Sequence, residues 1–288
     1  MGNAVRNYLT LIFLAFIWGS SFILMKRGLE VFDFMDVAAL RIFIAFISLI
    51  PFLPNAIRVV QQKQYLPIII SAFLGSGIPA ILFAKAQTEL DSGLVGTLNS
   101  VVPLFTLILG VYFFNFRPTK ANFLGVFIGL TGTLILSFTT SQEEFTFNGY
   151  IFLVVLATIF YAISINVIKK YLFKLDASSI AALSFMLIGP IAAIYLFNTN
   201  FINKIQTNSE SYKALGYIAL LAILGTSFAA IIFNRLLNRT SAIFVSSITY
   251  LIPIVAILWG VFDGEIITLS YKISFLIILS SIYLVNKK

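Results

Sequence analysis

The sequence contains neither cysteine nor histidine, and it is poor in charged residues. Without cysteine and histidine, the chain cannot form disulfides, thiolate nucleophiles, histidine-based acid–base pairs or the common zinc sites. Only 10% of the 288 residues are charged, whereas about 25% are charged in an ordinary soluble domain. These charges are too few to cover the surface of a water-soluble fold, so we expect lipid to surround most of the chain.

The basic residues do not form a patch, although the formal net charge is +8. They occur singly or in pairs between apolar runs, which excludes an extended basic face for nucleic acid. We therefore expect no nucleic-acid partner, no metal and no cofactor, and we expect the lipid bilayer to be the surroundings of the protein.

Long apolar runs dominate what is present, since 60% of the residues are hydrophobic. A membrane-spanning helix needs about 20 mainly apolar residues. The candidate runs are 8–25, 37–53, 66–84, 92–114, 121–138, 149–168, 177–197, 214–234, 241–262 and 268–285. Stretches such as 11–17 are apolar at every position, unlike the alternating strands of a membrane barrel. The sequence predicts an all-α membrane protein with ten transmembrane helices.

The distribution of lysine and arginine predicts the orientation, because short cytoplasmic loops carry an excess of both. With the amino terminus inside, 12 of these residues fall in cytoplasmic segments and six in outer segments. We expect a multi-pass protein of the cell inner membrane with both termini in the cytoplasm. The first run lacks an A-x-A-like cleavage site and is followed by Lys26 and Arg27, so we expect it to be a retained helix.

The second half of the chain repeats the first. A shift of 150 residues superposes Leu74-Gly75 on Leu224-Gly225, Phe83 on Phe233, Val95 on Val245, Pro103 on Pro253 and Gly110-Val111 on Gly260-Val261. A shift of 143 places Asp33 and 38–40 on Asp176 and 181–183. We predict two five-helix repeats, at 1–140 and 145–288. Because five is odd, the second repeat enters the membrane inverted, an architecture typical of secondary transporters that work by alternating access.

Several motifs resemble one transporter family. They are Phe16-Ile17-Trp18-Gly19-Ser20-Ser21-Phe22, Ala38-Ala39-Leu40-Arg41, Asn99-Ser100-Val101-Val102-Pro103-Leu104-Phe105, and Pro253 followed by Gly260 and Glu265. Together they resemble the EamA-type members of the drug/metabolite transporter superfamily. The resemblance implies a ten-helix carrier that exports or exchanges small metabolites, often amino acids or related compounds. The first repeat has Asn115 where the glutamate is usual, so only Glu265 can carry that residue's role.

The fourth run has a small and polar face. Ser92, Gly96, Asn99, Pro103, Thr106 and Gly110 recur at steps of four and three, which places them on one side of a helix. Such a face can serve close helix packing or line a cavity. Asn99 favours the cavity, because lipid cannot satisfy an amide in the middle of a span.

Other polar or aromatic residues at similar depth complete the candidate substrate-binding set. That set is Trp18, Ser21, Lys85, Asn99, Tyr161, Asn166, Ser227, Asn234, Thr249 and Tyr250. The rings of Trp18 and Tyr161 can stack on an apolar substrate or hold an amine by cation–π attraction.

Two cations inside or near spans have alternative interpretations. Arg41 can pair structurally with Asp33 or Asp36, or it can belong to an outer gate, as can Glu265. Lys85 can pair with Glu89 or reach toward the cavity. No acidic residue lies at mid-span, which favours facilitated exchange or export over proton coupling.

Proline and glycine mark further features of the runs. Pro79 and Gly189-Pro190 predict kinks. Gly125 and Gly129 form a G-x-x-x-G face, which predicts either close helix packing or a dimer seam, so a monomer and a weak homodimer both remain open.

The sequence favours a carrier for a small-molecule substrate, with amino acids or related zwitterions as the leading class. A multidrug or organic-cation exporter is the alternative, although such a carrier is expected to place a carboxylate in its cavity. A non-transporting receptor or scaffold has no need of an inverted repeat. A membrane enzyme is disfavoured because the clusters of carboxylates, histidines or metal ligands that catalysis uses are missing.

Overall fold

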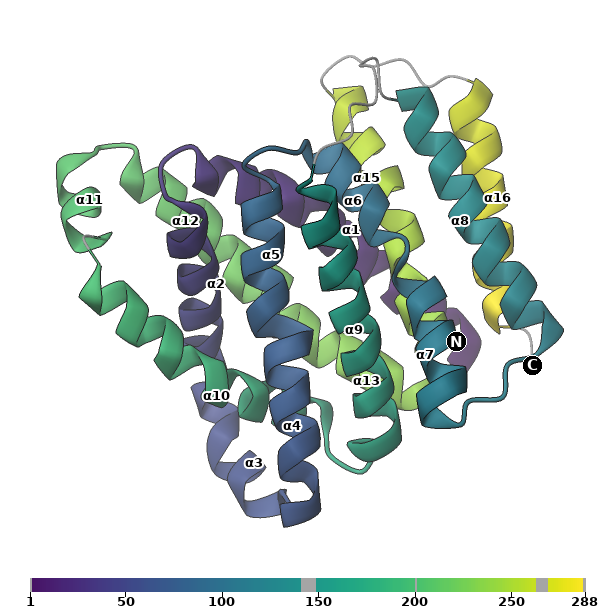
Figure 1. Cartoon of the computed structure of the whole chain (residues 1–288), viewed down its shortest axis with the longest axis horizontal. Coiled ribbons are helices and arrows are strands. Elements are labelled where there is room, and N and C mark those ends of the chain that lie inside the picture. The colour runs from purple at the N-terminus through teal and green to yellow at the C-terminus, as the bar shows by residue number, and fades with distance from the viewer. Residues whose placement is uncertain (1, 141–148, 200, 263–268, 287–288) are drawn as a thin grey trace.

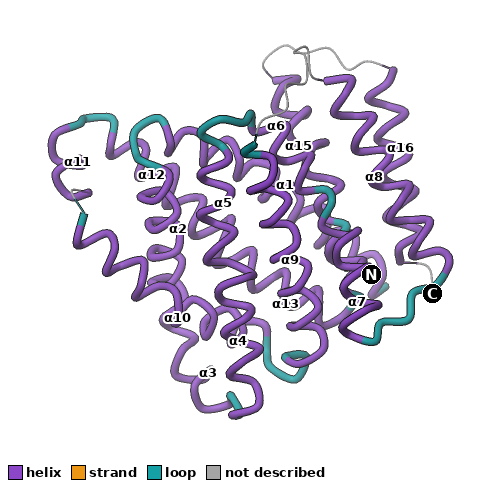
Figure 2. Tube along the Cα trace, viewed as in Figure 1, coloured by secondary structure: helices purple, strands orange, loops and turns teal. Residues whose placement is uncertain are grey.

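A computed structural model describes residues 2–140, 149–199, 201–262 and 269–286 of the chain, and these residues form helices joined by short turns (Figures 1 and 2). The first half contains α1 (Asn3–Leu29), α2 (Phe34–Leu49), η1 (Ile50–Phe52), α3 (Leu53–Val59), η2 (Gln62–Gln64), α4 (Tyr65–Ala72), η3 (Phe73–Gly77), α5 (Ile78–Ala86), α6 (Ser92–Asn99), α7 (Val102–Phe114) and α8 (Lys120–Thr140). The second half contains α9 (Ile151–Tyr171), α10 (Ala177–Asn198), α11 (Phe201–Thr207), α12 (Ser211–Ala222), η4 (Ile223–Phe228), α13 (Ala229–Arg239), α14 (Ala242–Ser246), α15 (Ile248–Phe262) and α16 (Leu269–Asn286).

Seven helical stretches of the described chain are long and apolar enough to cross a membrane. They are Ala4–Leu29, Phe34–Val59, Gln62–Ala86, Ser92–Phe114, Ile151–Tyr171, Ala177–Asn198 and Ser211–Arg239. Three shorter apolar helices, Lys120–Leu136, Ala242–Val255 and Lys272–Asn286, fall in the other predicted runs. The predicted all-helical fold is observed, while the total of ten spans stays a prediction.

The helices of the two halves interlock. The first helix of each half packs into the other half, since α1 contacts α15 and α12 while α9 contacts α7 and α5. The second helices pack against each other as α2 and α10, and the last helices pack as α8 and α16. Corresponding helices of the two predicted repeats therefore occupy corresponding places.

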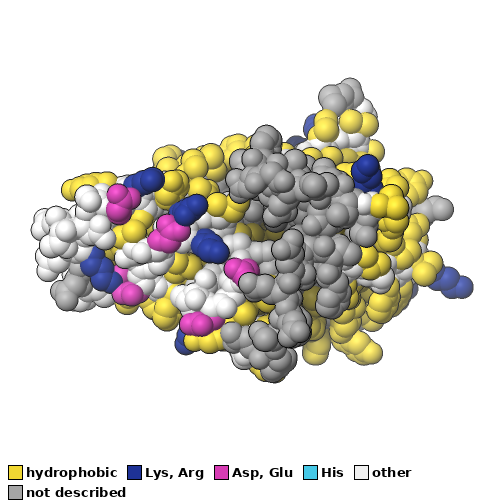
Figure 3. Space-filling model, turned by 90° about the horizontal axis from the view of Figure 1, so that it is seen from above, with side chains coloured by type: hydrophobic (Ala, Val, Ile, Leu, Met, Phe, Trp, Pro, Cys, Tyr) yellow, Lys and Arg dark blue, Asp and Glu magenta, His cyan; other side chains and the backbone are white. Residues whose placement is uncertain are grey.

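Charged side chains lie at one end of the bundle, and helix α1 begins at the other end. Helix α1 begins and α16 ends on the same side of the bundle (Figure 1), where the Asn286 amide donates a hydrogen bond to the Tyr8 hydroxyl at 3.0 Å. Figure 3 looks onto the opposite end, where acidic and basic side chains mingle beside α11 and hydrophobic side chains cover the flanks. Charged ends and an apolar belt are the arrangement that a bilayer imposes.

Both long spans that correspond to the third run of each half contain a π-helical segment. The first is η3, which immediately precedes α5, whose second residue is Pro79, and the second is η4. They begin 150 residues apart, at Phe73 and Ile223, which is the register of the sequence repeat. Pro190 lies inside the continuous helix α10. Single-turn π-segments within helices are frequent at functional sites.

The G-x-x-x-G face of α8 packs inside the chain. A side chain added at Gly125 would overlap Val285 of α16, and one added at Gly129 would overlap the Tyr250 ring of α15. The Tyr250 hydroxyl donates to the Val126 carbonyl at 2.9 Å, and its ring is fully buried. The face that could have formed a dimer seam is thus occupied by α15 and α16.

Gly129→Val is expected to destabilise the protein, because the new methyl groups must displace Tyr250 from a filled interface. Overpacking of this kind costs about 1–3 kcal/mol. Thermal unfolding of the purified protein in detergent measures the loss. Gly216→Val is the matched control, because Gly216 lies in helix α12 and nothing lies within 4 Å of an added Cβ. Equal unfolding temperatures for the two variants would contradict the packing of α8 against α15 and α16.

Candidate functional site

A cavity of about 170 Å³ lies between the two halves. Its walls come from α1, α2 and the stretch α4 to α7 of the first half, and from α9, α10 and the stretch η4 to α15 of the second half. A cleft between halves of a helical bundle is the common location of a small-molecule site in membrane carriers.

The residues that line the cavity form pairs related by the sequence repeat. With a shift of 143 in the first two helices and 150 in the next two, the pairs are Trp18/Tyr161, Phe22/Ile165, Met25/Ile168, Arg41/Ser184, Ile42/Phe185, Gly75/Gly225, Ser76/Thr226, Ala80/Ala230, Phe83/Phe233, Asn99/Thr249 and Val102/Ile252. Most pairs conserve size or polarity. The pair Arg41/Ser184 differs in charge, so the cavity is symmetric in shape and asymmetric in electrostatics.

Two aromatic contacts face the cavity at equivalent positions. Trp18 lies against Phe233 with ring centroids 5.4 Å apart, and Tyr161 stacks on Phe83 at 5.7 Å. The Trp18 indole N–H donates to the carbonyl of Gly225 at 2.9 Å, which fixes the ring orientation. The walls therefore offer rigid aromatic surface for an apolar part of a ligand.

Each π-helical segment is pressed against the first helix of the other half. A Cβ added at Gly225 would overlap the hydroxyl of Ser21, and one added at Gly75 would overlap the hydroxyl of Ser164. These two contacts are related by the repeat, since Ser21 corresponds to Ser164 at the shift of 143. Glycine permits the close approach at both places.

Asn99 is the polar group that the described structure leaves unsatisfied at the cavity. Its side chain is 6% exposed, and its Oδ1 has no hydrogen-bond partner among the described residues. The neighbouring Ser100 hydroxyl donates to the Thr249 carbonyl at 3.0 Å and joins the two halves there. A buried acceptor without a donor costs about 1–3 kcal/mol, so the arrangement favours a ligand that donates a hydrogen bond to Asn99.

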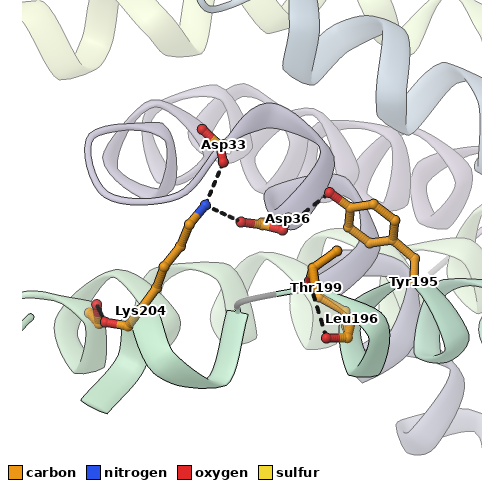
Figure 4. A network of polar contacts seen from close by, with 7 residues as sticks. Asp33, Asp36, Tyr195, Leu196, Thr199 and Lys204 are labelled. Atoms are coloured by element: carbon orange, nitrogen blue, oxygen red, sulfur yellow. Dashed lines mark hydrogen bonds and ion pairs between the residues drawn. The ribbon is translucent and has the colours of Figure 1, made fainter. Parts of the chain in front are cut away.

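Arg41 lines the cavity, and the predicted structural pair with Asp33 or Asp36 does not form. Its Nε donates instead to the Thr226 hydroxyl of η4 at 2.7 Å. Lys204 of α11 forms ion pairs with both aspartates, as Figure 4 shows. Its Nζ lies 2.9 Å from Asp36 Oδ2. The two aspartates are therefore paired with Lys204 and not with Arg41.

The cluster around Lys204 closes the end of the bundle that carries α11. The Tyr195 hydroxyl donates to Asp36 Oδ1 at 3.3 Å, so the buried carboxylate has two partners from the second half. The hydrogen bonds from Lys204 to Asp33 and Asp36 raise the pKa of its ammonium above the ordinary value. Lys204 therefore keeps its positive charge throughout the physiological pH range.

Six predicted binding residues lie together around the cavity, and Arg41 lies with them. They are Trp18, Ser21, Asn99, Tyr161, Asn234 and Thr249. Lys85 lies outside this group. It is exposed, its ammonium lies 5.6 Å from the centroid of the Phe34 ring, and no ion pair with Glu89 occurs in the described structure.

Three further predicted residues do not line the cavity. The Asn166 amide donates to the carbonyls of Thr106 and Ala162 at 3.0 and 2.9 Å. The Ser227 hydroxyl donates to the Ile223 carbonyl at 2.9 Å, within its own helix. Tyr250 faces α8, as described above. Glu265 lies outside the described residues.

The sequence interpretation missed residues that the cavity includes. Phe83, Phe233, Ser184 and Thr226 line it, yet they were not in the candidate set. For Ser184 the repeat held the signal, because Ser184 is the copy of the candidate Arg41. In the described part of the chain no three acidic side chains gather where they could hold a metal ion.

Comparison with known proteins relates the whole chain to membrane transporters. The model of the EamA-like transporter family matches residues 6–138 and 148–287. The chain is 26% identical to the uncharacterized transporter YoaV of Bacillus subtilis, over 97% of this chain and 96% of that protein. It is 24% identical to an uncharacterized transporter of Archaeoglobus fulgidus, over 99% and 100%. It is also 24% identical to the uncharacterized inner membrane transporter YedA of Escherichia coli, over 85% and 78%.

A solved structure has the same fold. It aligns with a TM-score of 0.71 at 15% identity, covering 95% of this chain and 94% of that chain.

Leucine substitutions at Asn99 and Asn166 are expected to separate the cavity from the packing. Asn166→Leu removes two hydrogen bonds between helices and within α9, at roughly 1 kcal/mol each, so it should lower the unfolding temperature. Asn99→Leu removes an acceptor that has no donor and should leave that temperature unchanged or higher. Thermal unfolding of both variants in detergent is the measurement. A larger loss for Asn99→Leu would show that Asn99 has a packing role.

Proposed function

The chain belongs to the EamA-like transporter family, and we propose that it is a carrier that moves small metabolites across the inner membrane by alternating access. Export or exchange of amino acids or related zwitterions is the proposed activity. The observation that carries the proposal is the cavity between the halves, lined by residue pairs that the repeat relates. A carrier needs a site that either half can close, and pseudosymmetric halves provide two equivalent ways to close it.

We propose ten spans in two inverted repeats, with both termini in the cytoplasm. Three observations support this topology. Ten apolar helical stretches occur at the predicted runs, seven of them of full spanning length. Helix α1 begins and helix α16 ends on the same side of the bundle, which an even number of spans requires. The excess of lysine and arginine favours the cytoplasm for that side.

The proposed substrate class follows from the chemistry of the walls. The described lining offers aromatic rings, serine and threonine hydroxyls, the amides of Asn99 and Asn234, and the cation Arg41. No carboxylate occurs among these lining residues. A cavity for organic cations would need an acid to replace lost hydration of the cation, so zwitterions with small apolar side chains fit better than cationic drugs.

The same lining bears on the driving force. A proton-coupled pump ordinarily carries an ionisable carboxylate along its pathway. In the described part of the chain the buried acid Asp36 is bonded to Lys204 and lies outside the cavity lining. We therefore propose exchange or downhill export rather than proton-driven pumping.

Counterflow in proteoliposomes tests the proposed function. Vesicles that contain the purified protein and an unlabelled amino acid should accumulate the labelled compound, whereas vesicles with the same ionic contents but without the amino acid should not. A screen of amino acids and other zwitterions in which no compound shows counterflow would contradict the proposal.

Asn99→Leu is expected to reduce counterflow strongly while the amount of folded protein stays normal. The side chain keeps its volume but can no longer accept a hydrogen bond from the substrate. Gly216→Ala is the control, since no atom of another helix lies within 4 Å of a Cβ added at Gly216. Activity of Asn99→Leu within about twofold of the unmodified protein would correspond to less than about 0.4 kcal/mol, too little for a buried substrate contact.

A further inference from the structure

We propose that Arg41 binds a carboxylate of the transported molecule and thereby makes the carrier select acids and zwitterions over amines. The inference rests on the proposed transport function and deepens it, because it assigns one charged group to one end of the substrate.

The positive charge of Arg41 has no counter-ion in the described structure. The four ion pairs found there join Lys26, Arg27 and Lys204 to acids at the outer end of the bundle, and none includes Arg41. The acids nearest along α2, Asp33 and Asp36, are held by Lys204. A largely buried cation without a partner is costly in a membrane protein, so such residues mark substrate pathways.

The Nε of Arg41 is hydrogen-bonded, and its two Nη groups have no hydrogen-bond partner among the described residues. Nε donates to the Thr226 hydroxyl at 2.7 Å, and Arg41 makes no other hydrogen bond to a described residue. The two Nη groups form a planar pair of hydrogen-bond donors, and such a pair matches the two oxygens of a carboxylate. Thr226 also donates to the Leu221 carbonyl at 3.2 Å, so its hydroxyl is held in place to accept from Nε.

Among the described lining residues, only one of the two positions related by the repeat carries a cation. The residue equivalent to Arg41 is Ser184, whose hydroxyl donates to that of Ser71 at 3.4 Å. The position equivalent to Arg41 therefore holds a neutral pair of hydroxyls and not a second cation. Together with the unpartnered acceptor on Asn99, this polarity suits a molecule with an anionic group and a separate hydrogen-bond donor.

The test uses three compounds that share the same isobutyl group. They are L-leucine, 4-methylpentanoate, which lacks the amine, and 3-methylbutylamine, which lacks the carboxylate. At millimolar concentration, leucine and 4-methylpentanoate should raise the unfolding temperature of the purified full-length protein in detergent, and the amine should not. Stabilisation by the amine alone, by inorganic phosphate in place of the acids, or by none of these compounds would overturn the proposal.

Variants of Arg41 assign the preference to this side chain. Arg41→Gln should weaken the binding of 4-methylpentanoate by at least about tenfold, which is 1.4 kcal/mol, and Arg41→Lys should retain part of it. Lys85→Gln is the matched control, because it removes the same charge outside the cavity. Equal acid affinity in Arg41→Gln and the unmodified protein would overturn the assignment. If Arg41→Gln does not fold, Arg41→Lys decides, since unchanged acid affinity there excludes recognition by the planar fork.

Thr226 serves as a positioning residue in this scheme. Thr226→Val should weaken acid binding while the preference for acids over amines persists, and Thr226→Ser should restore the affinity because it restores the hydroxyl. A loss that Thr226→Ser does not recover would show packing rather than positioning. Counterflow that occurs without any preference for acids would remove the role of Arg41 and leave the transport function standing, whereas absence of counterflow by every zwitterion would remove both.

Discussion

The structure depends on one constraint, which is that backbone groups inside a bilayer must find their hydrogen-bond partners within the protein. Regular helix meets this need along most of the chain. At the π-helical segment η4, an indole from the opposite half donates to the Gly225 carbonyl. Near the break between α6 and α7, the Ser100 hydroxyl donates to a carbonyl of α15. Irregular backbone therefore gathers where the halves meet, and the cavity lies at the same place.

The interface between the halves also determines where charge can be placed. Lys204 neutralises two aspartates at one end of the bundle and leaves Arg41 unpaired beside the cavity. In lipid, an unpaired charge at this depth is expensive. In the proposed mechanism, a substrate that carries an anionic group offsets that cost when it binds, and the offset contributes to its affinity. Because the copy of Arg41 is the neutral Ser184, only one of the two equivalent positions in the cavity carries a positive charge.

Hydrophobic runs were sufficient to predict the helices, and the small polar face of the fourth run was sufficient to predict Asn99 at the cavity. The sequence could not separate Asn99 from Asn166, because both are amides within apolar spans. Their roles depend on what faces them. Asn166 fits beside Gly110, where a missing side chain leaves room for its amide to reach the Thr106 carbonyl. The ion pairs of Lys204 could not be predicted from the sequence either, since its partners lie 168 and 171 residues away in the other half.

The central claim is that the cavity opens alternately to the two sides of the membrane, and the natural absence of cysteine makes it directly testable. Ser184→Cys places a single thiol of nearly native size in the cavity wall. The measurement is its rate of reaction with a membrane-impermeant sulfonatoethyl methanethiosulfonate, in intact cells and in inverted vesicles. The account predicts reaction from both sides, slowed on both by a compound that shows counterflow. Reaction from one side only, in a variant that still transports, would contradict it.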